Sequence, residues 1–235
     1  MEVEAPFYDG RSLYGVREHT LVYRHLKERP LKGLPTRQEC TWQPKENAMC
    51  IPKPRTINEI ILEAMEKEGF RSNHVDDLGG DTTYGITEAT ARHLGYKESM
   101  DNLTPDIAYS LYLNEYVQRV NFDDIHAVSA IVGEEVIDTG INMGQYTAAV
   151  FLQRWLNVFN NKQSYYKDLV IDGQVGPATI TALKAFLSKR GQEGEIVLWK
   201  SLNCSQGSRY LDITQARENN ESFVYGWMKN RVGMV

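Results

Sequence analysis

Apolar side chains recur at helical spacing along most of the chain after residue 55. Thr56 and Glu59 have the spacing of a capping box, and the apolar positions that follow predict a helix ending near Glu68, where Gly69 stops it. Residues 70–86 are polar and glycine-rich, which predicts a small β-hairpin or wing. The same reasoning predicts further helices over residues 88–94, 104–120, 125–143, 146–159, 177–190, 195–202 and 209–230.

The first 55 residues differ from this pattern. Five of the eight prolines lie between Pro30 and Pro54, and no helical period persists there. The segment nevertheless carries several aromatic side chains, which suggests that it packs against its own domain or a partner. We therefore expect a mainly α protein with a Pro-rich arm over 1–55, a helical lobe with a β-wing over 56–136, and a helical module over 137–235.

Composition narrows the classes of function. A net charge of −5 and a pI of about 5.6 disfavour binding to nucleic acid through phosphate neutralisation. No apolar run is long enough to span a membrane, and the N-terminus lacks the features of a signal peptide. Three cysteines make no disulfide framework or zinc pattern; we expect free thiols, although Cys40 and Cys50 could pair across a short loop.

Glu68 is the first candidate for chemistry. At about 100° per residue, it shares a stripe with Ile61 and Ala64, whereas the other glutamates of this helix fall on the opposite side. Partial burial there would raise the pKa of its carboxyl group, as a general acid at neutral pH requires. A side chain that swings out to water at the helix end fits this position equally well.

The segment after Glu68 adds a second carboxylate. Asp77 precedes a Gly-Gly turn, and Thr82 and Thr83 follow it. Glycoside hydrolysis needs one carboxyl group to protonate the leaving oxygen and usually a second group to position water or stabilise the sugar cation. His74 lies among aspartates, but one histidine without ligand spacing indicates a solvated wing rather than a metal site. No metal or organic cofactor is expected.

These residues resemble a known family. Glu68, then Asp77, then Thr83, followed by the run Tyr84 to Thr87, is similar to the catalytic region of phage-type lysozymes, and most closely to glycoside hydrolase family 108. Phe70 departs from the family's second glycine. The resemblance implies an α+β lysozyme-like fold and an N-acetylmuramidase that acts on bacterial peptidoglycan without a cofactor.

Two downstream segments resemble the same kind of protein. The spacing of Asp138, Asn142 and Gly144 is similar to a helix of the same family. The run from Asp172 to Thr179 resembles peptidoglycan-binding helical modules, although these residues themselves are expected to form a structural turn. The resemblance covers residues 56–235 and leaves the arm unexplained.

The site that we expect combines both lines of reasoning. Glu68 donates the proton, and Asp77, helped by the hydroxyl group of Thr83 or Thr82, holds water or stabilises the sugar cation. The expected substrate contacts are Tyr84, Asn142, Tyr165 and Tyr166. The neighbouring Glu134 and Glu135 are expected on a helix surface.

Two other functions remain open at this stage. A lytic transglycosylase would use Glu68 without Asp77 and release an anhydro sugar. A non-catalytic protein would keep a lysozyme-like fold to plug or anchor a phage tail. Without a signal peptide, the family resemblance implies a phage endolysin in the host cytoplasm or a virion component, with residues 1–55 docked on a tail or baseplate protein.

Overall fold

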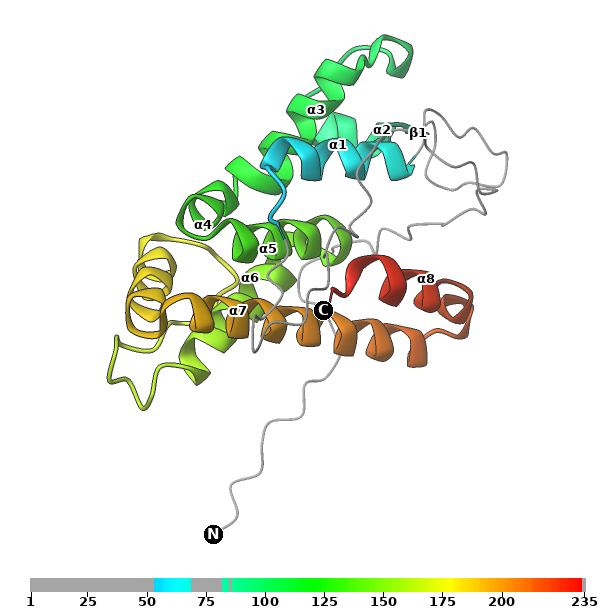
Figure 1. Cartoon of the computed structure of the whole chain (residues 1–235). Coiled ribbons are helices and arrows are strands. Elements are labelled where there is room, and N and C mark those ends of the chain that lie inside the picture. The colour runs from blue at the N-terminus through cyan, green and yellow to red at the C-terminus, as the bar shows by residue number, and fades with distance from the viewer. Residues whose placement is uncertain (1–52, 69–81, 85, 234–235) are drawn as a thin grey trace. The chain divides into compact units, whose positions relative to one another are not determined.

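The computed structural model describes residues 53–68, 82–84 and 86–233, all of which lie within one compact unit, Cys40–Val235. The described part is mainly α, as the sequence predicts, with one small two-stranded sheet (Figure 1). Within these residues, no helix is both long and apolar enough to cross a lipid bilayer. The arm over residues 1–52, together with Cys40 and Cys50, lies outside the described residues.

The described chain contains eight α-helices, two short strands and three irregular helical turns. The α-helices are α1 (Ile57–Glu68), α2 (Glu88–His93), α3 (Pro105–Leu113), α4 (Phe122–Val128), α5 (Ala130–Met143), α6 (Gln145–Val158), α7 (Pro177–Gln215) and α8 (Glu221–Arg231). The strands are β1 (Thr82–Thr83) and β2 (Ile86–Thr87), and the turns are η1 (Met100–Asn102), η2 (Asn114–Gln118) and η3 (Glu218–Asn220).

Helix α1 begins and ends where the sequence predicts. The backbone N–H of Glu59 donates to Thr56 Oγ1 at 3.2 Å, and that of Thr56 donates to Glu59 Oε2 at 2.7 Å, so the capping box is formed. Ile61 and Met65 are buried, and α1 packs on α3 and α5. The cap therefore fixes the start of a helix whose last residue is Glu68.

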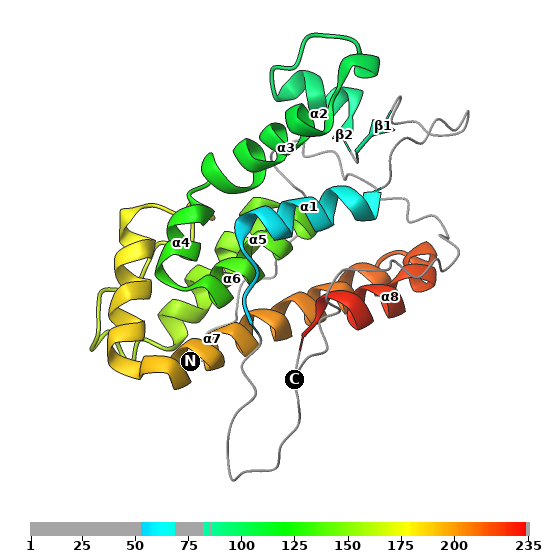
Figure 2. The ribbon, with the colours of Figure 1, turned by 45° about the horizontal axis from the view of Figure 1, so that its top comes forward.

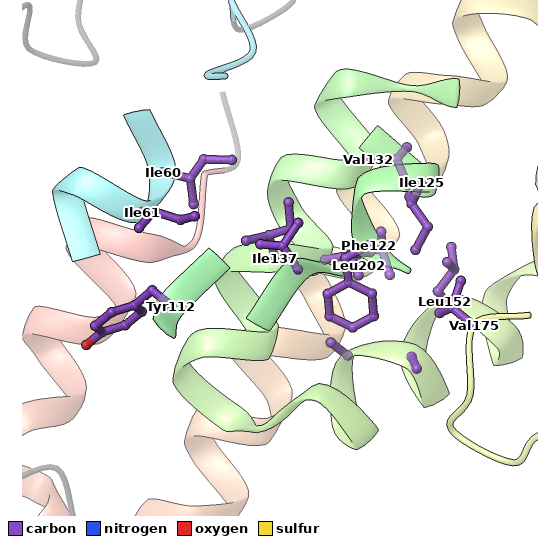
Figure 3. Packing of buried hydrophobic residues seen from close by; sticks show 14 of the residues in the cluster. Ile60, Ile61, Tyr112, Phe122, Ile125, Val132, Ile137, Leu152, Val175 and Leu202 are labelled. Atoms are coloured by element: carbon purple, nitrogen blue, oxygen red, sulfur yellow. The ribbon is translucent and has the colours of Figure 1, made fainter. Parts of the chain in front are cut away.

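The core is arranged around α5. This helix packs against α1, α4, α6 and α7, and none of its residues is exposed, as expected for a central helix. One hydrophobic cluster runs from Ile61 of α1 through Ile137 of α5 to Leu202 of α7 (Figure 3). The predicted division between residues 136 and 137 falls inside α5 and stays a prediction.

The prediction of one helix over residues 125–143 is wrong. The chain breaks at Ser129, which has extended φ and ψ of −150° and 109°. Ser129 Oγ accepts a hydrogen bond from the N–H of Val132 at 3.2 Å and donates to Glu195 of α7 at 2.6 Å. The serine therefore caps α5, and α4 turns away as a separate helix.

The C-terminal helices also differ from the prediction. Instead of separate helices over 195–202 and 209–230, α7 continues to Gln215, and α8 follows after η3. Helix α7 bends at Gly191, whose φ and ψ are 59° and −154°, so its first part ends near Arg190 as predicted. The bend is visible where the yellow and orange parts of α7 meet (Figures 1 and 2).

Candidate functional site

Glu68 is the last residue of α1. Ile61 and Met65, two turns and one turn earlier, are buried, so helical spacing places Glu68 on the same face as the core residues. Both views place this end of α1 beside the hairpin of β1 and β2 (Figures 1 and 2). The side chain of Glu68 and the whole of 69–81, with His74 and Asp77, lie outside the described residues.

The hairpin carries the predicted threonines. Thr82 pairs with Thr87 and Thr83 with Ile86 in antiparallel register. Thr83 is buried, and its hydroxyl has no hydrogen-bond partner among the described residues. A buried hydroxyl costs free energy unless something satisfies it, which makes Thr83 a candidate for contact with a bound group. The side chain of Thr82 lies outside the described residues.

Tyr84 sits at the tip of this hairpin. Its φ is 52°, a left-handed value that is uncommon for a residue with a Cβ. Tyr84 is half-buried and packs against the hydrophobic core. The hairpin therefore brings Thr83 and Tyr84 together near the end of α1.

Asn142 belongs to a different group of side chains. Its Nδ2 donates to the backbone carbonyl of Asp138 at 2.7 Å and to Asp138 Oδ2 at 3.2 Å. Asp138 also accepts from Gln206 of α7 at 3.1 Å and pairs with Arg231 of α8 at 3.3 Å. Asp138 thus joins three helices, a role that sequence reasoning missed because its partners are distant along the chain.

The prediction that Glu134 and Glu135 lie on a helix surface is wrong. Glu135 is 3% exposed and accepts a hydrogen bond from Asn203 Nδ2 at 2.7 Å. Glu134 accepts from Arg55 Nε at 2.8 Å, and Arg55 also pairs with Glu63 of α1. Glu135 therefore connects α5 to α7, and Glu134 connects α5 to the segment before α1, because each carboxylate faces a donor from elsewhere in the chain.

Tyr165 and Tyr166 lie in the connection between α6 and α7, and both are half-buried. Buried Asn160 holds this connection: its Nδ2 donates to the carbonyl of Tyr166 at 2.7 Å, and its Oδ1 accepts from the N–H of Tyr166 at 3.1 Å. The hydroxyl of Tyr166 donates to the carbonyl of Leu156 at 2.6 Å, so this hydroxyl group is already bonded within the fold.

The phenol group of Tyr166 should lose its proton only at high pH. Burial, reinforced by the negative charge of Asp168, raises the pKa of Tyr166 to about 12. Because the folded pKa exceeds that of the unfolded chain, the stability linked to this phenol is complete below about pH 10 and is lost as pH rises toward 12. Subtracting the absorbance titration of Tyr166→Phe from that of the wild type should isolate this phenol; an ordinary pKa would contradict its burial.

The turn from Asp172 to Gly176 is built as a structural unit. Gln153 Nε2 donates to Asp172 Oδ1 at 2.8 Å, and this bond, with one from the N–H of Gln174, lowers the pKa of Asp172. Gly173 has a φ of 70°, and a Cβ there would lie 2.2 Å from Cδ2 of Tyr146. Tyr146 is 62% exposed and covers the turn, a contact that sequence reasoning did not find.

The predicted site residues therefore fall in three places. Glu68, Thr82, Thr83 and Tyr84 lie around the end of α1, Asn142 lies at the end of α5, and Tyr165 and Tyr166 lie after α6. In the part of the chain that the structure describes, no three His, Cys, Asp or Glu side chains are grouped to hold a metal ion.

Comparisons with known protein families match two parts of the chain. Residues 61–144 match the family described as Glycosyl hydrolase 108, and residues 147–232 match the one described as Predicted Peptidoglycan domain. No curated protein matches the chain. The solved structure of Brucella abortus SagA is 22% identical, covers 73% of this chain and 95% of its own, and has a TM-score of 0.44. The first match identifies residues 61–144 as a glycoside hydrolase domain of lysozyme type, and the second places a peptidoglycan domain on its C-terminal side.

Proposed function

We propose that this peptidoglycan hydrolase is a muramidase, which cleaves the bond between N-acetylmuramic acid and N-acetylglucosamine. The observation that carries the proposal is the end of α1 at Glu68 beside a hairpin with Thr82 and Thr83. The last residue of this helix shares a face with the buried core residues and lies next to a hairpin. Such a position is suitable for a carboxylic acid of raised pKa. The match of residues 61–144 to Glycosyl hydrolase 108 supports the same reaction class.

In the proposed reaction, the carboxylic acid of Glu68 gives its proton to the glycosidic oxygen as the bond to the anomeric carbon breaks. Asp77, assisted by the hydroxyl of Thr83 or Thr82, stabilises the positive sugar or holds the water that attacks it. The separation of the two carboxyl groups decides the stereochemistry: about 5 Å gives retention and roughly 6.5–9.5 Å gives inversion. The residues that we propose as substrate contacts are Tyr84, Asn142, Tyr165 and Tyr166.

The biological setting is a further part of the proposal. We propose a phage-encoded protein used for wall penetration or host lysis, with residues 1–55 docked on a tail or baseplate protein. The aromatic residues of the Pro-rich arm support its packing against a partner. Finding the protein in purified virions would favour a virion component over a free endolysin.

Asp77→Asn tests the reaction type. We expect the release of reducing ends from purified peptidoglycan to fall by roughly 10²-fold, because the amide cannot serve as the second carboxylate. Asp76→Asn removes the same charge from the neighbouring residue and should leave the rate near that of the wild type. A transglycosylase would tolerate Asp77→Asn and release anhydro sugars, and a structural protein would release nothing from any variant.

A further inference from the structure

A groove of about 250 Å³ opens at the bend of α7, beside the end of α6. Its apolar side is aromatic: Phe159 stacks on Phe186 with ring centroids 5.8 Å apart, and Trp155 stacks on Phe159 at 5.2 Å. Arg190, Glu193, Gly194 and Val197 line the rest. A concave apolar site with a few charged groups at its rim is the usual form of a small-ligand site.

Two glycines keep the groove open. Gly191 has φ and ψ of 59° and −154°, a region that residues with a Cβ rarely enter. A Cβ on Gly194 would lie 2.1 Å from the Cβ of Arg190, so only glycine lets the arginine side chain cross this position. The bend therefore depends on glycine at both places, and it determines where Arg190 lies.

Arg190 is the cation at the rim. Its guanidinium carbon lies 5.7 Å from the ring centroid of Tyr165, within the range of a cation–π contact. The side chain is exposed, and no carboxylate among the described side chains forms an ion pair with it. The ring orients the guanidinium while leaving its N–H groups available to an anion.

The loop that supplies Tyr165 is held in a strained form. Asn161, Lys162 and Gln163 have consecutive left-handed φ angles of 47°, 56° and 61°. Such a run costs free energy, and buried Asn160 maintains it through hydrogen bonds to Tyr165 and Tyr166. Strain of this kind, held by a buried side chain, is typical of a segment that presents a residue for binding.

We propose that this groove binds the peptide stem of peptidoglycan, with a stem carboxylate on Arg190, an alanine methyl group on Phe159, and the amine of a diamino acid on Glu193. This inference rests on peptidoglycan being the substrate and deepens the proposed function. A peptide fits better than a sugar because Phe186 is 2% exposed and Phe159 is half-buried, so neither ring offers a free face for stacking a hexose. Opposite charges at the rim match a stem that carries both carboxylates and an amine.

Calorimetry on the full chain with the synthetic tripeptide L-Ala-γ-D-Glu-meso-diaminopimelic acid tests the proposal. Arg190→Gln should raise the dissociation constant roughly tenfold, because a charge-assisted hydrogen bond is lost. Lys189→Gln removes the same charge from the neighbouring exposed residue and should bind like the wild type. Equal binding by Arg190→Gln and the wild type, or no binding of the tripeptide at all, would overturn the proposal.

Further measurements distinguish the ways in which this proposal and the proposed function could fail. Glu193→Gln should weaken binding of the diaminopimelate tripeptide but not of L-Ala-γ-D-Glu-L-Ala, which lacks the side-chain amine of the diamino acid; an equal loss for both peptides would contradict the assigned contact. Binding of tetra-N-acetylchitotetraose in place of the tripeptide, sensitive to Arg190→Gln, would make this a glycan site instead. Tripeptide binding by a wild type that cleaves no peptidoglycan would reject the muramidase and retain the groove.

Discussion

Replacing Glu68 by glutamine is expected to lower the rate of peptidoglycan hydrolysis by roughly 10²–10⁴-fold. The amide has the shape of the acid but no proton of suitable pKa to give to the leaving oxygen. The rate of clearing of a purified wall suspension measures the effect directly. Binding of the wall should persist, because the module over residues 147–232 is unchanged.

Glu66→Gln is the matched control for this experiment. It makes the same change from carboxyl group to amide in the same helix, at a position that helical spacing places on the other side of α1 from Glu68. We expect this variant to clear walls at nearly the wild-type rate. Equal losses in the two variants would point to a general effect of charge on α1, and no loss in Glu68→Gln would remove the assigned acid.

Replacing Gly133 by alanine should destabilise the fold by about 3 kcal/mol. A Cβ at this position would lie 2.3 Å from the backbone Cα of His126 in α4, and no flexible side chain can move aside to relieve this contact. Helices α4 and α5 would have to separate, which opens the core around buried Ile125 and Phe122. Urea unfolding followed by circular dichroism gives the change in free energy of unfolding.

Gly226→Ala is the corresponding control in α8. A Cβ at Gly226 would meet nothing within 4 Å, and its φ lies outside the positive region, so alanine should stabilise the helix by up to about 1 kcal/mol. Opposite signs for the two substitutions would show that the close approach of α4 and α5, and not helix propensity, requires Gly133. A Gly133→Ala variant as stable as the wild type would contradict this packing.

Signals between residues close in sequence were sufficient to predict where some helices begin and end. The capping box of Thr56 and Glu59 and the glycine after Glu68 correctly predicted both ends of α1, because these interactions involve neighbouring residues. Pro105 and Thr104 likewise marked the start of α3. The family resemblance found from Glu68 onward agrees with the match of residues 61–144 to Glycosyl hydrolase 108.

The errors arose where distant parts of the chain meet. Ser129 ends α4 by capping α5 and bonding Glu195, a residue far along the sequence. Glu135 is buried because Asn203 of α7 faces it, and Glu134 because Arg55 does. A polar residue in a helical pattern indicates exposure unless its partner is known, and hydropathy alone contains no information about that partner.

The candidate site combines sequence predictions with features that only the structure provides. The order of Glu68, Asp77, Thr82 and Thr83 indicated the chemistry, and the structure adds that α1 ends beside the hairpin. The burial of Thr83 and the placement of Arg190 over Tyr165 depend on tertiary packing and could not be predicted from spacing. The roles of Glu68 and Asp77 remain predictions that the variants above test.

The most direct test of the central claim is the mass spectrum of fragments released from purified peptidoglycan by the wild type and by Glu68→Gln. The wild type should produce fragments that end in reducing N-acetylmuramic acid, and Glu68→Gln should produce almost none. Fragments that end in anhydro-muramic acid, or intact strands after prolonged incubation with the wild type, would contradict a muramidase that acts through Glu68.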